Sequence, residues 1–164
     1  MSAAVTLRDV ARASDGPIIH DLVVATGVFH PNEIPVAVEL LDVRMAKGAS
    51  SGYDFLFAEM DQAVVGYACY GLNEMTESSW ELYWIAVDPS RQGKGIGRTI
   101  MDEVHRRIAL SGGGRICLDT SGRADYEPTR AFYLANGYRE VARLDDYYAP
   151  GDAKVILQRD VDPV

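Results

Sequence analysis

The chain has 164 residues and a formal net charge of −8, and 48% of its residues are hydrophobic. This length and composition indicate one globular domain, residues 1–164, with a buried core. The acidic balance argues against a protein that binds nucleic acid or anionic membranes, because both partners require basic surface. No apolar run approaches the roughly 18 residues of a membrane span, and residues 1–14 lack the apolar centre of a signal peptide, so we expect a cytoplasmic protein.

The cysteines and histidines do not form a ligand pattern. Cys69 and Cys117 lie far apart, each inside a segment typical of a strand, which favours reduced thiols over a disulfide framework. His20, His30 and His105 are scattered, with no spacing typical of metal ligands. We therefore expect no metal site. His30 precedes a proline where two helices join, and either lines an acceptor groove or is an ordinary loop residue.

In chain order, the first half predicts a strand, two helices and a hairpin. Residues 5–11 alternate apolar and polar side chains and predict the first strand. Residues 16–26 and 31–47 predict two helices, each followed by a glycine that can end it. Residues 53–60 and 63–72 predict two antiparallel strands joined by a two-residue turn.

The second half predicts a parallel unit followed by a short helix and two more strands. Residues 81–87 predict a strand, and a helix follows a glycine-rich turn and ends near residue 111. Residues 115–120 predict the next strand, which would run parallel to the first through a right-handed crossover. Residues 130–136 predict a short helix. The last two predicted strands are residues 138–144 and 153–159. The order indicates one α+β domain with a mixed sheet of about seven strands and about four helices.

The turn after residues 81–87 has the composition of an anion site. Pro89 ends the strand, because proline cannot donate a hydrogen bond to a ladder. Gly93, Gly95 and Gly97 allow positive φ angles and a close approach of a ligand to the backbone. Because a helix follows at once, several backbone N–H groups can point at one anion.

Basic side chains surround the same turn. Arg91, Lys94 and Arg98 have no acidic residue among them, in a chain that is acidic as a whole. This is the most positive short window of the sequence, and it coincides with the expected anion site. The alternative interpretation, in which these side chains are merely solvated at the start of a helix, stays open.

Two familiar phosphate motifs do not match. A P-loop requires a lysine followed by serine or threonine, whereas Lys94 is followed by Gly95. A dinucleotide fingerprint that begins at Gly93 would need glycine where Arg98 stands, although Asp119 lies at a strand end about 20 residues further on, as that motif requires. The chain is too short for a doubly wound sheet with a substrate domain. Nucleotide binding is kept as an alternative.

Two other segments do match a known pattern. Residues 92–97 read QGKGIG, a Q-x-x-G-x-G pattern after a strand and before a helix, and residues 86–89 read AVDP. Residues 131–138 read AFYLANGY, which is similar to an A-x-x-[FY]-Y-x-x-x-G-[FY] segment. In these motifs and in the order of its elements, the chain resembles the GNAT superfamily of N-acetyltransferases. The resemblance implies a mostly antiparallel central sheet whose parallel strand–helix–strand unit carries the coenzyme.

That resemblance implies acetyl-coenzyme A as co-substrate, with its pyrophosphate on the glycine turn. The donors would be the backbone N–H groups from Gln92 through Arg98, supplemented by the helix dipole and by the cations Lys94 and Arg98. The pantetheine arm would pair with the backbone of Ala86 and Val87, and the N–H of Val87 would polarise the thioester carbonyl. The expected cofactor-binding residues are Ala86, Val87, Gln92, Gly93, Lys94, Gly95, Ile96, Gly97 and Arg98.

Two catalytic residues are expected from the same resemblance. Glu81 matches a base glutamate of some members, and strand alternation would put it on one face with Ile85 and Val87. A partly buried carboxylate can have a raised pKa, although an exposed charge at a strand end explains Glu81 equally well. Tyr133 matches the general-acid tyrosine, and its alternative is an ordinary aromatic packed on a helix.

The sequence departs from the family pattern at one position. An asparagine that contacts the coenzyme often precedes the acid tyrosine by seven residues, and here Tyr126 stands there. Its contact is either lost or made by Thr129 or Arg130. Asp119, at the end of its strand, would touch the acceptor or the pantetheine, or turn the chain.

We therefore expect an N-acetyltransferase that moves an acetyl group to a primary amine by direct attack in a ternary complex. The alternative is an acyl-coenzyme A-binding module without turnover. The acceptor is a small molecule or a peptide amine, and an acidic surface suits a cationic amine. Homodimerisation is common in the family, and nothing in the sequence decides it.

Overall fold

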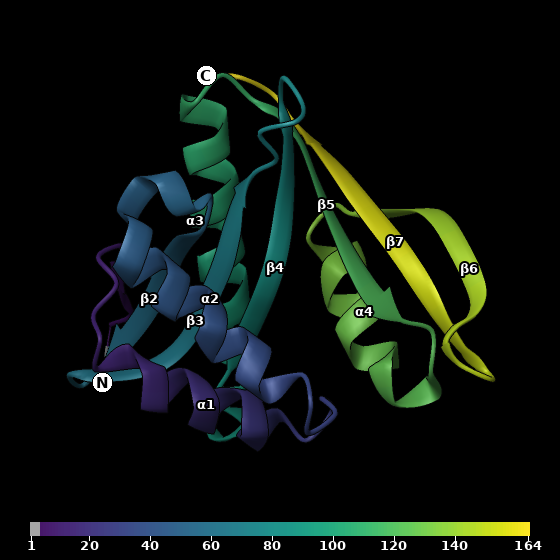
Figure 1. Ribbon diagram of the computed structural model, residues 1–164, viewed down its shortest axis with the longest axis horizontal. Helices are drawn as coiled ribbons and strands as arrows, with labels where there is room; N and C mark the ends of the chain where they lie inside the picture. The colour runs from purple at the N-terminus through teal and green to yellow at the C-terminus, as the bar shows by residue number, and fades with distance from the viewer. Residues whose placement is uncertain (1–3) are drawn as a thin grey trace.

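A computed structural model describes residues 4–164, which form one mixed sheet with helices on both faces (Figure 1). Seven strands and four α-helices lie within this range. In chain order they are β1 (Thr6–Arg8), α1 (Asp15–Thr26), α2 (Ile34–Lys47), β2 (Asp54–Met60), β3 (Ala63–Leu72), β4 (Ser79–Val87), α3 (Ile96–Leu110), β5 (Gly114–Ser121), α4 (Glu127–Ala135), β6 (Arg139–Ala149) and β7 (Asp152–Val161). No helix among the described residues has the length and apolar character needed to cross a bilayer.

The strands lie in the order β1-β2-β3-β4-β5-β7-β6. Every neighbouring pair is antiparallel except β4 and β5, which are parallel and connected through α3. A parallel pair requires a crossover of this kind, because a tight turn would reverse the strand direction. The mixed, mostly antiparallel sheet with one parallel β-α-β unit is thus confirmed.

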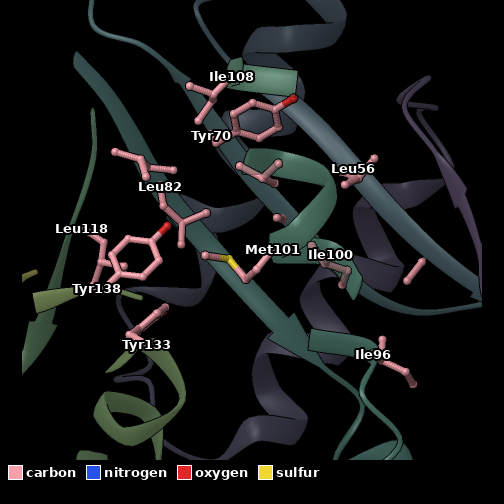
Figure 2. Packing of buried hydrophobic residues seen from close by; sticks show 14 of the residues in the cluster. Leu56, Tyr70, Leu82, Ile96, Ile100, Met101, Ile108, Leu118, Tyr133 and Tyr138 are labelled. Atoms are coloured by element: carbon pink, nitrogen blue, oxygen red, sulfur yellow. The ribbon is translucent and has the colours of Figure 1, made fainter. Parts of the chain in front are cut away.

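Two hydrophobic clusters cover the two faces of the sheet. One lies under α1 and α2 and includes Phe57 and Tyr67, both fully buried. The other lies under α3, whose buried residues follow helical spacing, and it extends to the β5 and β7 side, where Figure 2 shows Tyr138 beside Leu118. The buried residues of α3 are Ile96, Ile100, Met101, Val104, His105 and Ile108. Burial of both faces fixes the central strands and leaves their ends free to form a site.

The largest boundary differences occur near the chain ends. The first strand covers only Thr6–Arg8, instead of residues 5–11; Arg8 still pairs with Phe57 of β2, and its guanidinium donates hydrogen bonds to the carboxylate of Asp15 at the start of α1. The last hairpin is longer than expected, since β6 continues to Ala149, although its regular pairing with β7 is interrupted after Leu144. The interruption explains why strand periodicity was visible only up to that residue.

Smaller differences concern the starts of helices and strands. Helix α2 begins at Ile34 rather than at residue 31, and α4 spans Glu127–Ala135 rather than residues 130–136. Strand β4 begins at Ser79, two residues earlier than expected. Cys69 and Cys117 are both free thiols, the first buried and the second partly exposed.

Candidate functional site

The site lies where β4 and β5 diverge. The two strands pair only from Ser79 to Glu81 on β4 and from Arg115 to Cys117 on β5. Beyond these residues the strands continue without pairing to one another, and a cavity of about 750 Å³ opens between them. A cavity of this volume accommodates a drug-sized ligand. The wedge-shaped opening between the diverging strands β4 and β5, called the wedge below, therefore exposes one edge of β4 to a ligand in the cavity.

Most of the expected coenzyme residues line this cavity. Tyr133 is also in the wall, whereas the side chains of Lys94 and Glu81 are not. The expected coenzyme residues in the wall are Ala86, Val87, Gln92, Gly93, Gly95, Ile96, Gly97 and Arg98. The structure thus brings together the glycine turn, the end of β4 and the acid candidate from α4, three segments that are distant in sequence.

The glycine turn carries a set of unused backbone donors. The first N–H after the turn with a backbone acceptor is that of Thr99, which donates to the carbonyl of Gly95. Within the described part of the chain, the six N–H groups from Gly93 to Arg98 have no hydrogen-bond acceptor. The N–H of Gln92 differs, because it donates to the carbonyl of Pro89 at 3.4 Å. The donor set is therefore one residue shorter than the expected run from Gln92 to Arg98.

Positive φ angles at two glycines shape this turn. Gly93 has a φ of 79° and Gly95 a φ of 74°, a region that residues with a Cβ rarely adopt. A Cβ added at either position would meet no atom within 4 Å, so the glycines are needed for backbone conformation rather than for space. Consecutive N–H groups in such a turn at a helix start form a concave anion site.

The free edge of β4 presents a second row of backbone groups. The N–H of Asp88 donates to the carbonyl of Val65 at 2.8 Å, and Val87 lies opposite Gly66. Because bonded and non-bonded pairs alternate along an antiparallel ladder, the N–H and C=O of Val87 point away from β3 into the wedge. The same alternation directs the N–H and C=O of Ile85 into the wedge.

The main chain of Ala86 is directed the other way. Its carbonyl oxygen would lie 3.1 Å from a Cβ added at Gly66 on β3. Its side chain is buried in the cluster under α1 and α2. The open edge of β4 is therefore formed by Ile85 and Val87, and Ala86 contributes surface between them.

Glu81 lies on a different face from the expected one. The pairing of β4 with β3 shifts register at Tyr83, which has no partner residue on β3. One extra residue reverses the alternation, so Leu82 and Ile85 both pack in the cluster under α3, and Glu81 lies on the opposite face. The expectation that Glu81 shares a face with Ile85 and Val87 is wrong.

Glu81 instead lies at the apex of the wedge, paired with Cys117 in the last register before the strands diverge. Partial burial raises its pKa, and the negative charge of Asp119 raises it further, while Lys154 opposes both effects. Asp119 itself lines the cavity, and its carboxylate accepts a salt bridge from Lys154 at 2.9 Å. Of these two carboxylates, that of Asp119 lines the cavity and that of Glu81 does not.

Tyr133 packs among aromatic rings and also faces the cavity. Its ring packs against Phe132 and Tyr138, with centroid distances of 5.5 and 5.8 Å. It also lines the cavity with only 8% of its surface exposed, and its hydroxyl has no hydrogen-bond partner among the described residues. Burial raises the pKa of this phenol well above its ordinary value, so the hydroxyl keeps its proton at neutral pH.

The opposite rim of the cavity joins two loops that are distant in sequence. The hydroxyl of Tyr126 donates to the carbonyl of Val28 at 3.0 Å, and the guanidinium of Arg123 lies 3.1 Å from the Nε2 of His30. These contacts tie the connection between α1 and α2 to the connection between β5 and α4. His30 therefore lines the cavity, as one of its two interpretations required.

Two residues in the cavity wall remain as candidates for the coenzyme contact that an asparagine often makes in the GNAT pattern. Tyr126, which stands at that position, lines the cavity, and so does Thr129. Arg130 is instead engaged with the backbone, because its guanidinium donates to the carbonyls of Ser121 and Arg123 at 2.7 and 2.8 Å. Of the two substitutes suggested by the sequence, Thr129 is the one that faces ligand space.

Four aromatic side chains complete the wall. Phe29 and Trp84 pack with a centroid distance of 4.8 Å, and both line the cavity together with Tyr83 and Tyr148. They come from the α1–α2 connection, β4 and the end of β6. Only the register of β4 could have shown that Trp84 faces the cavity. No local sequence pattern shows which aromatic residues of the other elements do so.

Comparison with known proteins identifies the family. The acetyltransferase (GNAT) domain matches residues 51–140, more than half of the chain. A crystal structure of a protein from Desulfovibrio desulfuricans, assigned to the GNAT family of acetyltransferases, is 42% identical, with a TM-score of 0.93 over 96% of this chain and 99% of that one. PaiA N-acetyltransferase from Thermoplasma acidophilum, solved with coenzyme A, is 16% identical, with a TM-score of 0.72 over 96% and 99% of the two chains, and shows the fold alone.

Two curated relatives match a shorter region. The N-alpha-acetyltransferase RimI of Mycobacterium tuberculosis is 29% identical over 114 residues, 68% of this chain and 68% of that protein. An uncharacterised protein of Mycobacterium leprae is 30% identical over 114 residues, and the match spans 68% of this chain but only 30% of that protein. With its matching domain, its sheet order and its glycine turn at the wedge, the chain belongs to the GNAT family of acetyltransferases.

Proposed function

We propose that the protein is an acetyl-coenzyme A-dependent N-acetyltransferase that acts on a primary amine by direct transfer in a ternary complex. The observation that carries this proposal is the row of six unpaired backbone N–H groups from Gly93 to Arg98 at one end of a cavity. Such donors, fixed before a ligand binds, suit a diphosphate, because little ordering is needed on binding. The presence of coenzyme A in the related fold of PaiA agrees with this ligand.

The rest of the coenzyme would extend along β4. The N–H and C=O groups of Ile85 and Val87 that face the wedge are arranged to pair with an extended pantetheine arm, as a neighbouring strand would. The N–H of Val87 then lies near the thioester carbonyl. A donor directed at the oxygen that becomes negative in the tetrahedral intermediate lowers the barrier of acyl transfer.

In the chemical step, the amine nitrogen attacks the thioester carbonyl carbon and forms the N–C bond. Collapse of the tetrahedral intermediate breaks the C–S bond, and the electron pair leaves on the sulfur. The hydroxyl of Tyr133 donates its proton to this sulfur and is reprotonated from solvent. A buried phenol with a raised pKa and no other hydrogen-bond partner is suited to this role, because it is protonated and available.

The amine must also lose a proton before or during attack. Glu81 has a raised pKa but does not line the cavity, so it would accept this proton through a water molecule rather than directly. Asp119 acts electrostatically on Glu81 and lines the cavity, so of the two carboxylates it is the one that would contact the incoming ammonium group. The two carboxylates therefore divide binding and proton removal between them.

Thiol release with acetyl-coenzyme A and a panel of amines tests the proposal, alongside a thermal shift with coenzyme A. We expect coenzyme A to raise the unfolding temperature and at least one amine class to release thiol. A thermal shift without turnover on any amine would instead indicate a coenzyme-binding module. A shift with ATP or NAD but none with coenzyme A would contradict the proposal at its first step.

A further inference from the structure

We propose that the acceptor end of the cavity selects an amine that carries at least one further positive charge, such as a small diamine or polyamine. This inference rests on the proposed function and names its substrate class. It follows from how charge, aromatic surface and the unpartnered Tyr133 hydroxyl are distributed around one cavity.

Charge is divided between the two ends of the cavity. At the glycine turn, the charged side chains in the wall are Arg91 and Arg98, both cationic. Away from the turn, every acidic residue of the wall comes from the opposite rim, on the α1–α2 connection, β5, β7 and the segment after β5. These acids are Glu33, Asp119, Asp125 and Asp152, and one cation, Arg123, stands among them. The coenzyme end is thus basic and the acceptor end acidic.

The chain's own cations neutralise only part of the acidic rim. Arg123 contacts Asp125 at 3.0 Å and Asp152 at 3.7 Å, and Lys154 contacts Asp119 at 2.9 Å. Two cations facing four carboxylates leave two negative charges, and Glu81, outside the wall, adds a further carboxylate on which Asp119 acts electrostatically. In a partly enclosed site, uncompensated charges of one sign favour a ligand of the opposite sign.

Aromatic surface lies beside these carboxylates. Tyr83 and Tyr148 are 40% and 47% exposed, although both line the cavity, so their rings are available to a ligand. Aromatic ring faces bind organic cations, and the same rim already does so within the chain, where Lys154 Nζ lies 4.7 Å from the centroid of the Tyr147 ring. Carboxylates next to open rings form a surface suited to an alkylammonium rather than to a hydrated metal ion.

An independent observation marks this cavity as a ligand site. The hydroxyl of Tyr133 belongs to a side chain that is more than nine-tenths buried, it lines the cavity, and it has no partner among the described residues. Because this hydroxyl opens into the cavity and no described residue bonds to it, it is free to form its hydrogen bond with a ligand. If the reacting sulfur lies at Tyr133, the attacking nitrogen lies between Tyr133 and the acidic rim. A second charge on the acceptor would then face the remaining carboxylates.

A matched pair of acceptors tests this inference. 1,5-Diaminopentane and pentylamine share a five-carbon chain and a reactive amine, and they differ in one ammonium group. With acetyl-coenzyme A saturating, we expect kcat/KM for the diamine to exceed that for the monoamine by at least about tenfold, from one or two ionic contacts. The ratio should fall as salt is raised, because part of the rim is exposed to solvent.

Two variants separate the rim from general charge effects. Asp119→Asn should reduce the preference for the diamine, whereas Asp42→Asn, which removes an exposed carboxylate on α2 away from the cavity wall, should leave the preference unchanged. Binding of each amine to the coenzyme A complex, measured by calorimetry, provides a second readout that does not require turnover. Here too the diamine should bind more tightly.

Equal kcat/KM values and equal affinities for the two amines would overturn the inference while leaving the proposed function intact. A preference that is the same in Asp119→Asn as in the unmodified protein would also overturn it. Coenzyme binding without turnover on either amine or on any other member of a wider panel would remove the proposed function, and the inference would fail with it.

Discussion

Two neighbouring tyrosines provide a sharp test of the proposed acid. Tyr133 and Tyr138 are both buried, and their rings pack edge to face with centroids 5.8 Å apart. The hydroxyl of Tyr138 lies 2.9 Å from the Nε2 of His105, whereas that of Tyr133 has no hydrogen-bond partner among the described residues. Replacing each by phenylalanine removes the same atom, but only one replacement breaks a hydrogen bond of the folded protein.

The two variants should have opposite effects: Tyr133→Phe should lower kcat but not stability, and Tyr138→Phe should lower stability but not kcat. Tyr133→Phe removes an unpaired hydroxyl, so the free energy of unfolding should change by less than about 0.5 kcal/mol. If Tyr133 protonates the leaving sulfur, kcat should fall by about 10²–10⁴-fold, with little change in affinity for coenzyme A.

The control variant, Tyr138→Phe, should behave in the reverse way. Arg159 donates to the Nδ1 of His105 at 2.8 Å, so the ring proton of the neutral imidazole is on Nε2 and would lose its acceptor. A buried donor left unpaired costs about 1–3 kcal/mol, while turnover at a temperature where the variant is folded should be retained. Urea unfolding and single-turnover kinetics measure the two quantities. Unchanged kcat in Tyr133→Phe, or equal destabilisation of both variants, would refute the reasoning.

Three further predictions concern stability and the glycine turn. Burial, with a smaller contribution from Arg159, lowers the pKa of His105 to about 4. Because the unfolded chain already binds this proton near pH 6.5, about 3 kcal/mol of stability should be lost as pH falls from 6.5 to 4. His105→Gln should flatten the pH dependence of the free energy of unfolding in this range, measured by urea unfolding. Gly95→Ala should cost about 1–2 kcal/mol through backbone strain alone and weaken coenzyme A binding in calorimetry, since φ is 74° there and no atom obstructs a Cβ. Asp15→Ala should lower the free energy of unfolding by about 1.5–3 kcal/mol, because Arg8 loses its buried partner but keeps its salt bridge with Glu59 at 2.7 Å, and urea titration would show a smaller loss if the Arg8–Asp15 pair were unimportant.

The parts of the site that depend on local sequence could be predicted. Positive φ angles at Gly93 and Gly95 follow from residue type, and a glycine turn between a strand and a helix leaves free N–H groups wherever it occurs in a fold. The strand and helix periods were likewise readable, so the β-α-β unit was confirmed with α3 beginning at Ile96. These features depend on few neighbours in sequence.

The parts that depend on partners elsewhere could not be predicted. The face of Glu81 is decided by the extra residue at Tyr83, which exists only in the register with β3 and has no local signature. The acidic and aromatic rim is assembled from several strands and two loops, so residues such as Phe29 and Asp152 meet only after folding. Single-sequence patterns carry no information about such meetings, so the sequence suggested single residues of the acceptor end, His30 and Asp119, but not the rim that forms around them.

Amide chemical shifts would test the central claim most directly. In a ¹⁵N-labelled sample titrated with coenzyme A, the backbone amides from Gly93 to Arg98 should show the largest changes, with proton resonances moving downfield as each N–H acquires a phosphate acceptor. Pantetheine, which lacks the diphosphate, should instead affect the amides of Ile85 and Val87 and leave those of the glycine turn nearly unchanged. Coenzyme A binding that leaves the resonances of the glycine turn in place, or equal shifts with pantetheine, would contradict the account.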